Sequence, residues 1–437
     1  MRLERLLSAA LVGVAALVGT PLQAMAAQQP PKAADVGITD TEIRIAVVAD
    51  VDNPIVPGLF KAGADAVKAW GATIDKAGGI AGRKVVVDFI DSKLSANDTR
   101  NAVIKACAED FAMVGTEALS LTNVADLESC PNAQGQAIGI PELPGISSAT
   151  ERCSKVVFSI AGDAAYCATK DAPTKTYTVQ QGDYRYYLSK NKDLHGIWLA
   201  PSDSKSIKDA ASPSYQAGVD LGIKQDGEGV YDVFARDPQS SLTPFLNLVK
   251  QDGSTFVYNG SSASKMVQAR QEANIQGVDS VKVWACHQGC YDAAFLQTGG
   301  PDVEGTNSIL NTLPFYSEYK SNASLRSFAK QVGGVDKLNS YGMSAWVAAL
   351  LFQDAAEKAV ANGGALTRQS LFDALNNLHK FDAQGIMGPV DVAARVPPAC
   401  IVVAQVKNGK WARVHPAKPN TFDCSKQNLA EIKVAQG

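Results

Sequence analysis

Short apolar runs alternate with longer amphipathic segments from residue 42 onward. The β-branched run EIRIAVVAD at 42–50 ends in polar residues, and residues 58–79 then carry apolar positions at helical spacing up to a double glycine. The alternation continues with predicted strands at 84–91, 110–116 and 135–143 and predicted helices at 96–107 and 121–130. Apolar strands that alternate with amphipathic helices are typical of a parallel sheet with helices on both faces. This part of the chain therefore predicts an α/β lobe.

The same alternation restarts after a loop-rich stretch at residues 161–180. It predicts strands at 194–203, 229–237, 254–261 and 280–289, and helices at 183–191, 212–222, 242–251 and 263–274. The two halves share this pattern but not their sequence. We therefore predict two α/β lobes by architectural duplication, and not an array of repeats.

The remaining residues mix element types. They predict an extended segment at 306–319, a long buried helix at 339–364, a helix at 367–381 and a hairpin at 400–416. Thr367 is the expected N-cap of its helix, because a threonine hydroxyl can accept a bond from a free backbone N–H there. The Asn408-Gly409 pair predicts the hairpin turn, since both residues tolerate a positive φ.

The first residues have the composition of a secretory signal peptide. Arg2 and Arg5 precede an apolar run at 6–18, and Ala24-Met25-Ala26 has the small-x-small form of a cleavage site. An uncleaved anchor is the alternative, but the run is short for a bilayer span. We therefore predict a signal peptide at 1–26, a flexible leader at 27–41, and a periplasmic or secreted protein. No cysteine lies near the cleavage site, so a lipid anchor is not indicated.

Composition and charge narrow the class of partner. The formal net charge is -3, and the basic residues are spread along the chain without a basic stripe. This distribution argues against nucleic acid or an anionic membrane as the main partner. With 46% hydrophobic and 19% charged residues, the composition predicts a well-packed globular protein.

The eight cysteines form neighbouring couples along the chain. An even count in an exported protein predicts disulfides, although eight cysteines allow about 105 full pairings. We predict local bridges 107/130, 153/167, 286/290 and 400/424, which involve Cys107, Cys130, Cys153, Cys167, Cys286, Cys290, Cys400 and Cys424. The stretch CHQGC at 286–290 also raises a metal or redox site, but it lacks clustered histidines and C-x-x-C spacing.

Motifs of common enzyme classes are missing from the sequence. It contains no G-x-S-x-G, H-E-x-x-H or P-loop, no G-x-G-x-x-G after a strand, and its four histidines are scattered. We therefore expect no catalytic activity, no cofactor and no metal.

Several segments resemble one family in order and spacing. They include IDKAGGIAGRKV at 74–85, DFAMVG at 110–115, TFVYNGSSASKMVQARQEANIQG at 255–277, SYGMSAWVAALLFQDAAEKA at 340–359 and GPVDV at 388–392. Over residues 38–415 the chain resembles ABC-transporter solute-binding proteins of the leucine/isoleucine/valine-binding type. This resemblance implies the class I periplasmic binding fold, in which two Rossmann-like lobes with parallel sheets are joined by a hinge and close on a solute.

The resemblance also implies domain bounds and partners. Lobe 1 would span residues 42–165, with part of 305–395 returning to it, lobe 2 would span 166–304, and the hairpin with its tail would occupy 396–437. The implied partners are a small-molecule solute and an ABC permease, and a monomer is expected. A sensor module without a transport role is the alternative function.

Candidate ligand residues lie where strands of the two lobes end, because ligands of open α/β sheets bind at the carboxyl ends of the strands. They are Asn53, Phe60, Thr116, Glu117, Ala118, Leu119, Glu142 and Leu143 in lobe 1, and Asp203, Asn259, Ser261, His287 and Gln288 in lobe 2. For the strand-end carboxylates, solvation or helix capping is an equally good interpretation.

The strand-end loops differ from those of amino-acid binders in the family. The resemblance implies hydroxyls and backbone N–H groups for a ligand carboxylate, and an acid near position 288 for an ammonium group. Glu117 and Glu142 would instead repel a carboxylate, and this chain has His287 and Gln288 where that acid is expected. We therefore expect a less polar or cationic organic solute. A true amino-acid or amide ligand is the alternative.

Overall fold

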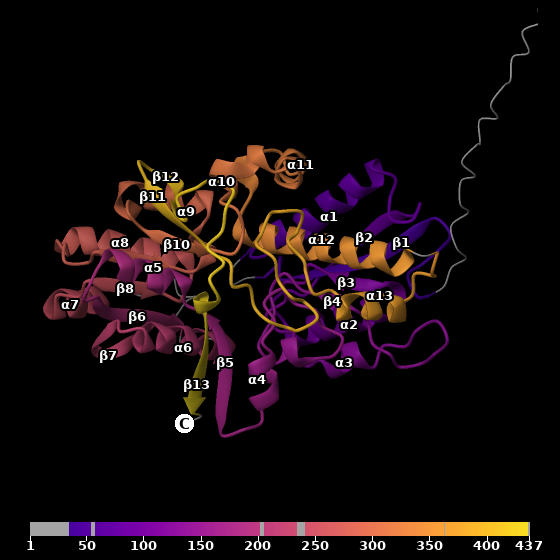
Figure 1. The fold of residues 1–437 in the computed structure, drawn as a ribbon, viewed down its shortest axis with the longest axis horizontal. Coiled ribbons are helices and arrows are strands. Elements are labelled where there is room, and N and C mark those ends of the chain that lie inside the picture. Colours follow the sequence, from indigo (N-terminus) through magenta and orange to yellow (C-terminus); the bar gives the residue numbers. More distant parts are fainter. Residues whose placement is uncertain (1–34, 54–56, 202–204, 234–240, 362, 436–437) are drawn as a thin grey trace, which may run out of the picture.

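The computed structural model describes residues 35–53, 57–201, 205–233, 241–361 and 363–435. Two α/β lobes lie side by side, with lobe 1 on the right of Figure 1 and lobe 2 on the left. The predicted fold class, two lobes built on parallel sheets, is confirmed. The predicted signal peptide and most of the leader lie outside the described residues.

Lobe 1 is built on a parallel sheet of four strands. Its order is β2 (Lys84–Asp91), β1 (Glu42–Ala49), β3 (Ala112–Val114) and β4 (Glu142–Leu143). In Figure 1, helix α1 (Lys61–Lys76) lies above this sheet, and α2 (Ala96–Glu109) and α3 (Ala125–Glu128) lie below it. Helix α12 (Ser340–Val360) packs against α1. Since α11 (Ala323–Gln331) packs on α1, and α13 (Arg368–Asn376) packs on α12, residues late in the chain return to lobe 1.

Helix starts in lobe 1 follow the capping chemistry of the sequence. The Thr367 side chain accepts from the N–H of Ser370 at 3.0 Å, and Ser370 Oγ accepts from the N–H of Thr367 at 2.9 Å, so the predicted N-cap is confirmed as a capping box. At α12, the Asn339 side chain accepts from the N–H of Gly342 at 2.8 Å. This cap sets where the long helix begins, which matters because its first turn faces lobe 2.

Arg368 at the start of α13 joins this helix to the core of lobe 1. Its fully buried guanidinium donates to the carbonyls of Phe111 at 3.2 Å, Pro131 at 2.7 Å and Cys107 at 3.0 Å. It also donates to the carbonyl of Asp110 at 2.5 Å. Burial lowers the pKa of Arg368 to about 10, so the group remains charged at neutral pH.

Lobe 2 contains a mixed sheet of seven strands. Its order is β12 (Lys410–His415), β11 (Val402–Lys407), β10 (Asn307–Leu310), β9 (Val283–Cys286), β8 (Phe256–Asn259), β6 (His195–Pro201) and β7 (Lys224–Val233). Strands β6 to β10 are parallel, whereas the hairpin β11–β12 is antiparallel and extends the sheet beyond β10. The surrounding helices are α5 (Gly182–Lys190), α6 (Lys205–Asp220), α7 (Thr243–Asp252), α8 (Ala263–Gln276), α9 (Ala293–Gly299) and α10 (Phe315–Glu318).

Three regions depart from the predicted elements. The stretch at 161–180 contains helix α4 (Ala164–Thr169) and strand β5 (Thr174–Gln180), although a loop is predicted there. The tail forms strand β13 (Leu429–Ala435), which pairs antiparallel with β5 from Leu429 opposite Gln180 to Ala435 opposite Thr174. Residues 306–319 are extended only at β10, because α10 begins directly after Pro314. The β5–β13 ribbon packs against α6 and lies at the bottom of Figure 1.

Three segments of the chain run between the lobes, and the side chain of Gln180 connects them. The three segments are β5, the residues after β10, and the residues before β11. Gln180 Nε2 donates to Asn311 Oδ1 at 2.7 Å and to the carbonyl of Pro398 at 2.6 Å. A residue of the first segment is therefore bonded to residues of the second and third.

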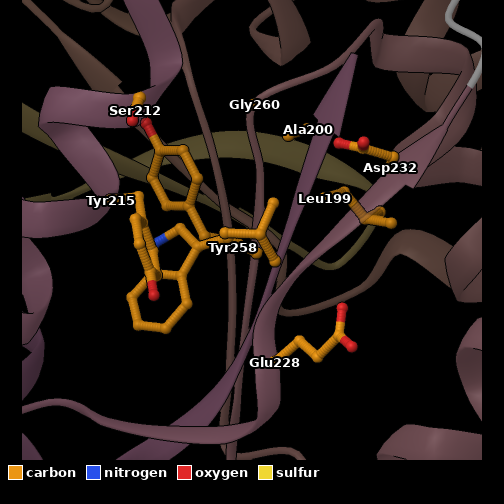
Figure 2. A pocket seen from close by; sticks show the side chains of 10 residues that line it. Leu199, Ala200, Ser212, Tyr215, Glu228, Asp232, Tyr258 and Gly260 are labelled. Atoms are coloured by element: carbon orange, nitrogen blue, oxygen red, sulfur yellow. The ribbon is translucent and has the colours of Figure 1, made fainter. Parts of the chain in front are cut away.

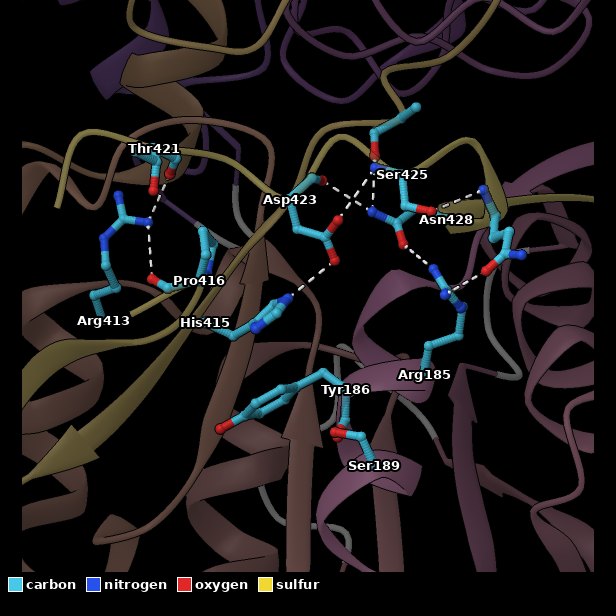
Figure 3. A network of polar contacts seen from close by, with 12 residues as sticks. Arg185, Tyr186, Ser189, Arg413, His415, Pro416, Thr421, Asp423, Ser425 and Asn428 are labelled. Atoms are coloured by element: carbon cyan, nitrogen blue, oxygen red, sulfur yellow. Dashed lines mark hydrogen bonds and ion pairs between the residues drawn. The ribbon is translucent and has the colours of Figure 1, made fainter. Parts of the chain in front are cut away.

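The tail before β13 is held by polar contacts to lobe 2 (Figure 3). His415 Nε2 and Asp423 Oδ2 are 2.9 Å apart, and the His415 ring stacks on Tyr186 with centroids 4.8 Å apart. The buried side chain of Asn428 accepts from Arg185 Nη1 at 2.7 Å and donates to the carbonyl of Asp423 at 2.9 Å. These contacts fix the path of the tail as it reaches β5.

The eight cysteines are joined as four disulfides. They are Cys107–Cys130, Cys153–Cys167, Cys286–Cys290 and Cys400–Cys424. These are the four neighbouring couples of the sequence, and each bridge constrains one local loop.

Candidate functional site

Asp50 organises the strand-end loops of lobe 1. It follows β1, and its fully buried carboxylate accepts from Ser92 Oγ at 2.6 Å and from the N–H groups of Leu94 and Leu119, both at 2.8 Å. The loops that follow β1, β2 and β3 are therefore connected through one carboxylate. Because its bonds are directed into the protein, we assign Asp50 to positioning the loops.

Glu117 lies inside lobe 1, and not on an open surface. Its side chain is fully buried between Gly63 of α1 and Gly145, where a Cβ on Gly145 would lie 2.9 Å from Glu117 Oε1. Neither carboxyl oxygen has a hydrogen-bond partner among the described residues. Burial raises the pKa of Glu117 well above its ordinary value, which favours the neutral form.

Glu142 and Glu151 form a second buried acidic group beside Thr116. Both oxygens of Glu142, Glu151 Oε1 and Thr116 Oγ1 lack hydrogen-bond partners within the described part of the chain. Burial, and then the charge of Glu151, raises the pKa of Glu142 well above its ordinary value. Burial also raises the pKa of Glu151 to about 7, and the Ser148 N–H at 3.1 Å partly offsets this effect.

The burial of Glu117 and Glu142 bears on the predicted repulsion of an anionic solute. That prediction requires both carboxyls to be charged, but both are buried and favour the neutral form. The physical reason is that both side chains turn into lobe 1, where desolvation disfavours the carboxylate. Asn53, Phe60, Thr116, Ala118 and Leu143 are also buried, and Leu119 is partly exposed.

Phe60 and Tyr341 form an aromatic pair at the edge of lobe 1. Their rings meet edge to face, with centroids 5.0 Å apart. Tyr341 belongs to the first turn of α12 and is partly exposed. Its hydroxyl would lie 3.5 Å from a Cβ on Gly289, so it faces the His287 loop of lobe 2. Burial, followed by the nearby Glu117, raises the pKa of Tyr341 to about 12.

The strand-end loops of lobe 2 are closed by their own hydrogen bonds. His287 Nε2 lies 2.7 Å from the Ser261 carbonyl, and His287 Nδ1 accepts from the N–H of Gly289 at 3.0 Å. This geometry assigns the proton to Nε2, and burial lowers the pKa of His287, so the ring is neutral. Asn259 Nδ2 donates to the Ser262 carbonyl at 2.9 Å. Both ring nitrogens of His287 are thus occupied within the loop.

The side chain of Ser340 joins the two sets of loops. Its Oγ donates to the Gln288 carbonyl at 2.6 Å and to the Tyr291 carbonyl at 3.3 Å, while the Gln288 side chain is exposed. The structure therefore brings His287 and Gln288 beside the start of α12 and the pair Phe60–Tyr341. Asp203 lies outside the described residues. Ser261 Oγ is buried and has no hydrogen-bond partner among the residues described.

The sequence interpretation omits Ser340 and Tyr341. The signal that could have found them is NSYG at 339–342, where a helix-capping Asn precedes an aromatic residue in the first turn of a long helix. A periodicity argument assigns this helix to the core. It does not show that the first turn faces the other lobe.

A cavity of about 310 Å³ lies elsewhere in lobe 2, between α6 and the sheet (Figure 2). It is lined by Trp198, Leu199, Ala200, Ser212, Tyr215, Glu228, Val230, Asp232, Tyr258 and Gly260. None of the predicted ligand residues that the structure describes lines it. The loops between the lobes and this cavity are therefore separate features.

Two further properties limit the chemistry of the described residues. Nowhere in them do three or more His, Cys, Asp or Glu side chains gather as a metal site would require. Among these residues, no helix is both long enough and apolar enough to cross a membrane.

Comparisons with known proteins agree with this architecture. Residues 42–410 match a family model described as periplasmic binding protein. A fatty acid ABC transporter substrate-binding protein from Thermomonospora curvata is 15% identical, with a TM-score of 0.67 over 90% of this chain and 95% of that chain. A leucine-binding protein from Thermotoga maritima is 15% identical, with a TM-score of 0.62 over 85% and 97% of the two chains.

A third solved structure has the same fold. It is a branched-chain amino acid ABC transporter protein from Thermus thermophilus with bound valine, 13% identical, with a TM-score of 0.64 over 89% of this chain and 98% of that chain. At these identities the likeness concerns the fold alone. A search of curated proteins finds no match.

Proposed function

Because the chain belongs to the periplasmic binding protein family, we propose that it captures a small organic solute between its lobes and delivers it to an ABC permease. The proposed type is that of the branched-chain amino acid transporters, and the proposed location is outside the cytoplasm. We propose that it acts as a monomer and without catalysis.

The observation that supports this proposal is the meeting of the two lobes at the start of α12. Ser340 Oγ bonds to the Gln288 carbonyl at 2.6 Å, and Tyr341 faces the loop of Gly289. Loops at the carboxyl ends of parallel strands are the usual ligand-binding edge of such sheets. The Gln180 contacts among the three connecting segments support a hinge between the lobes. A solute that enters between the loops would then be enclosed by hinge closure.

The side chains at this meeting point favour a solute with a large apolar part. Tyr341 and Leu119 offer aromatic and aliphatic surface, and the buried Phe60 packs against Tyr341. Glu117 is also buried, and its burial favours the neutral form. His287 is also neutral, with both ring nitrogens occupied. A cationic solute is no longer favoured, because Glu117 and Glu142, the carboxylates expected to attract it, face the interior. The related folds include proteins named for fatty acid and for branched-chain amino acid transport, so the architecture suits ligands of either polarity.

A thermal-shift screen followed by calorimetry tests both parts of the proposal. The panel would contain leucine, valine, aromatic acids, medium-chain fatty acids, amides and amines. A ligand at 100 times its Kd would stabilise the folded protein by about 2.7 kcal/mol through mass action. We expect a response to the less polar acids and none to leucine or valine. Micromolar binding of leucine would contradict the proposed ligand class but support solute capture.

A matched pair of variants tests where the ligand binds. Tyr341→Ala should weaken binding of any responding ligand at least about fivefold, since a buried aromatic contact is lost. Tyr319→Ala removes a partly exposed tyrosine elsewhere and should bind as the wild type does. If no class of compound binds, solute capture is contradicted. If both variants bind equally, the site does not lie at Tyr341.

A further inference from the structure

We propose that lobe 2 holds a second binding site, for a small organic ammonium ion, in the cavity between α6 and the sheet. This site goes beyond the solute capture proposed between the lobes. A volume of about 310 Å³ lies at the lower end of the range for ligand pockets, about 300 to 1,000 Å³. It therefore suits a molecule about the size of a single aromatic ring.

The register of the sheet explains why a cavity exists here. Trp198 of β6 lies opposite Val230 of β7 and Tyr258 of β8, so these side chains share one face. Two residues further along the same face, Ala200 lies opposite Asp232, and Gly260 follows β8. Large side chains thus give way to small ones toward the carboxyl ends of the strands. The missing volume of Ala200 and Gly260 is the space that α6 leaves open.

The aromatic walls of the cavity are held in place by their neighbours. Trp198 Nε1 donates to Tyr184 Oη at 3.3 Å, and Tyr184 Oη lies 3.2 Å from Ser214 Oγ. The rings of Trp198 and Tyr215 meet edge to face, with centroids 5.0 Å apart. The Tyr258 ring lies 5.5 Å from that of Tyr184. Because these contacts fix the rings before any ligand arrives, binding requires little side-chain ordering.

An acidic side chain at the rim sets the charge of the proposed ligand. Glu228 and Asp232 of β7 both line the cavity, and both are exposed. The Asp232 carboxylate points toward Ala200 in Figure 2, but Asp232 also interacts with another residue of the chain, so the attraction for a cation is assigned to Glu228. Aromatic faces attract a cation, and a nearby carboxylate adds to this attraction. An ammonium group attached to an apolar body matches this combination better than a neutral or anionic molecule.

Benzylammonium, benzyl alcohol and benzoate share one ring and differ in charge, so they test the site by calorimetry on the full chain. We expect benzylammonium to bind, benzyl alcohol to bind more weakly, and benzoate to bind least. Glu228→Gln should weaken benzylammonium about two- to fivefold, the effect of one exposed ion pair. Asp279→Asn removes an equally exposed carboxylate of lobe 2 away from the cavity and should leave the affinity unchanged.

A second variant tests the position independently of charge. Ala200→Leu should fill the cavity and weaken all three probes, with circular dichroism confirming the fold. If Ala200→Leu fails to fold, the comparison of Glu228→Gln with Asp279→Asn still tests the proposed site. The proposal is overturned if benzylammonium does not bind, if benzoate binds equally well, or if Glu228→Gln and Asp279→Asn bind it alike.

Discussion

The amide nitrogen of Gln180 donates to the side-chain oxygen of Asn311 at 2.7 Å, which joins the first and second segments that run between the lobes. The same nitrogen reaches the Pro398 carbonyl at 2.6 Å in the third segment. Lobe closure in such proteins requires these segments to bend together. Gln180 therefore couples the three parts of the hinge in the conformation described.

Replacement of Gln180 by Ala should loosen this coupling. We expect a loss of about 1 to 2 kcal/mol in the free energy of unfolding, because two hydrogen bonds disappear and the Pro398 carbonyl loses a donor. The radius of gyration from small-angle scattering should also change. Gln134→Ala, which removes an exposed glutamine from a loop of lobe 1, should change neither quantity. Equal behaviour of the two variants would count against a hinge role for Gln180.

Glu151 should make stability depend on pH between about 4.5 and 7. Its folded-state pKa is raised from 4.5 to about 7, so the unfolded chain releases this proton first as the pH rises. Below pH 4.5 the carboxyl is protonated in both states and costs nothing. Stability should then fall as the pH rises through this window, by an amount on the order of 3 kcal/mol for this group.

Glu151→Gln tests this dependence by denaturant unfolding at pH 5 and pH 8. We expect the variant to lose less stability than the wild type between the two pH values. Glu431→Gln, at an exposed position of β13, should retain the wild-type slope. A slope in Glu151→Gln as steep as that of the wild type would show that other groups cause the dependence.

Arg368→Met should be among the costly substitutions in lobe 1. It removes four hydrogen bonds to the carbonyls of Phe111, Pro131, Cys107 and Asp110, and it leaves those oxygens buried. We expect a loss of about 3 to 5 kcal/mol, measured by urea unfolding. Arg326→Met removes an exposed arginine and should cost less than about 0.5 kcal/mol. Comparable losses in both variants would refute an anchoring role for Arg368.

The four disulfides should differ in their effect on stability. The bridge Cys286–Cys290 closes a separation of 4 residues, whereas Cys400–Cys424 closes a separation of 24. The entropy removed from the unfolded chain grows with loop length, to about 2 kcal/mol for the short loop and about 3.5 kcal/mol for the long one. Double Cys→Ser variants of each pair should rank in this order by thermal unfolding. The reverse order would mean that the short bridge acts mainly on the folded loop.

The sequence predicts the fold well where burial is periodic. Strands β1 and β2, the long helix α12 and the Asn408-Gly409 hairpin follow from apolar runs or turn chemistry within a short window. Strands β5 and β13 cannot be predicted in this way, because Tyr177 and Ile432 are the only fully buried residues of these two strands and the others are partly or fully exposed. Their pairing depends on segments far apart in the chain, which no local pattern encodes.

The sequence indicates which loops meet between the lobes, but not how their side chains are oriented. Strand ends correctly indicate which loops approach the other lobe, as for His287 and Gln288. The direction in which Glu117 points depends on Gly63 and Gly145, two glycines from other elements that make room for its carboxyl. Sequence spacing does not contain this information. From the sequence alone, a buried neutral acid therefore cannot be distinguished from an exposed charged one.

The β5–β13 ribbon has a consequence for biosynthesis. Strand β5 is translated before all of lobe 2, whereas its partner β13 follows lobe 2. Each lobe can therefore form its sheet and bridges while the first connecting strand still lacks its partner. Pairing of β13 with β5 would come last, and it would connect two lobes that have already folded.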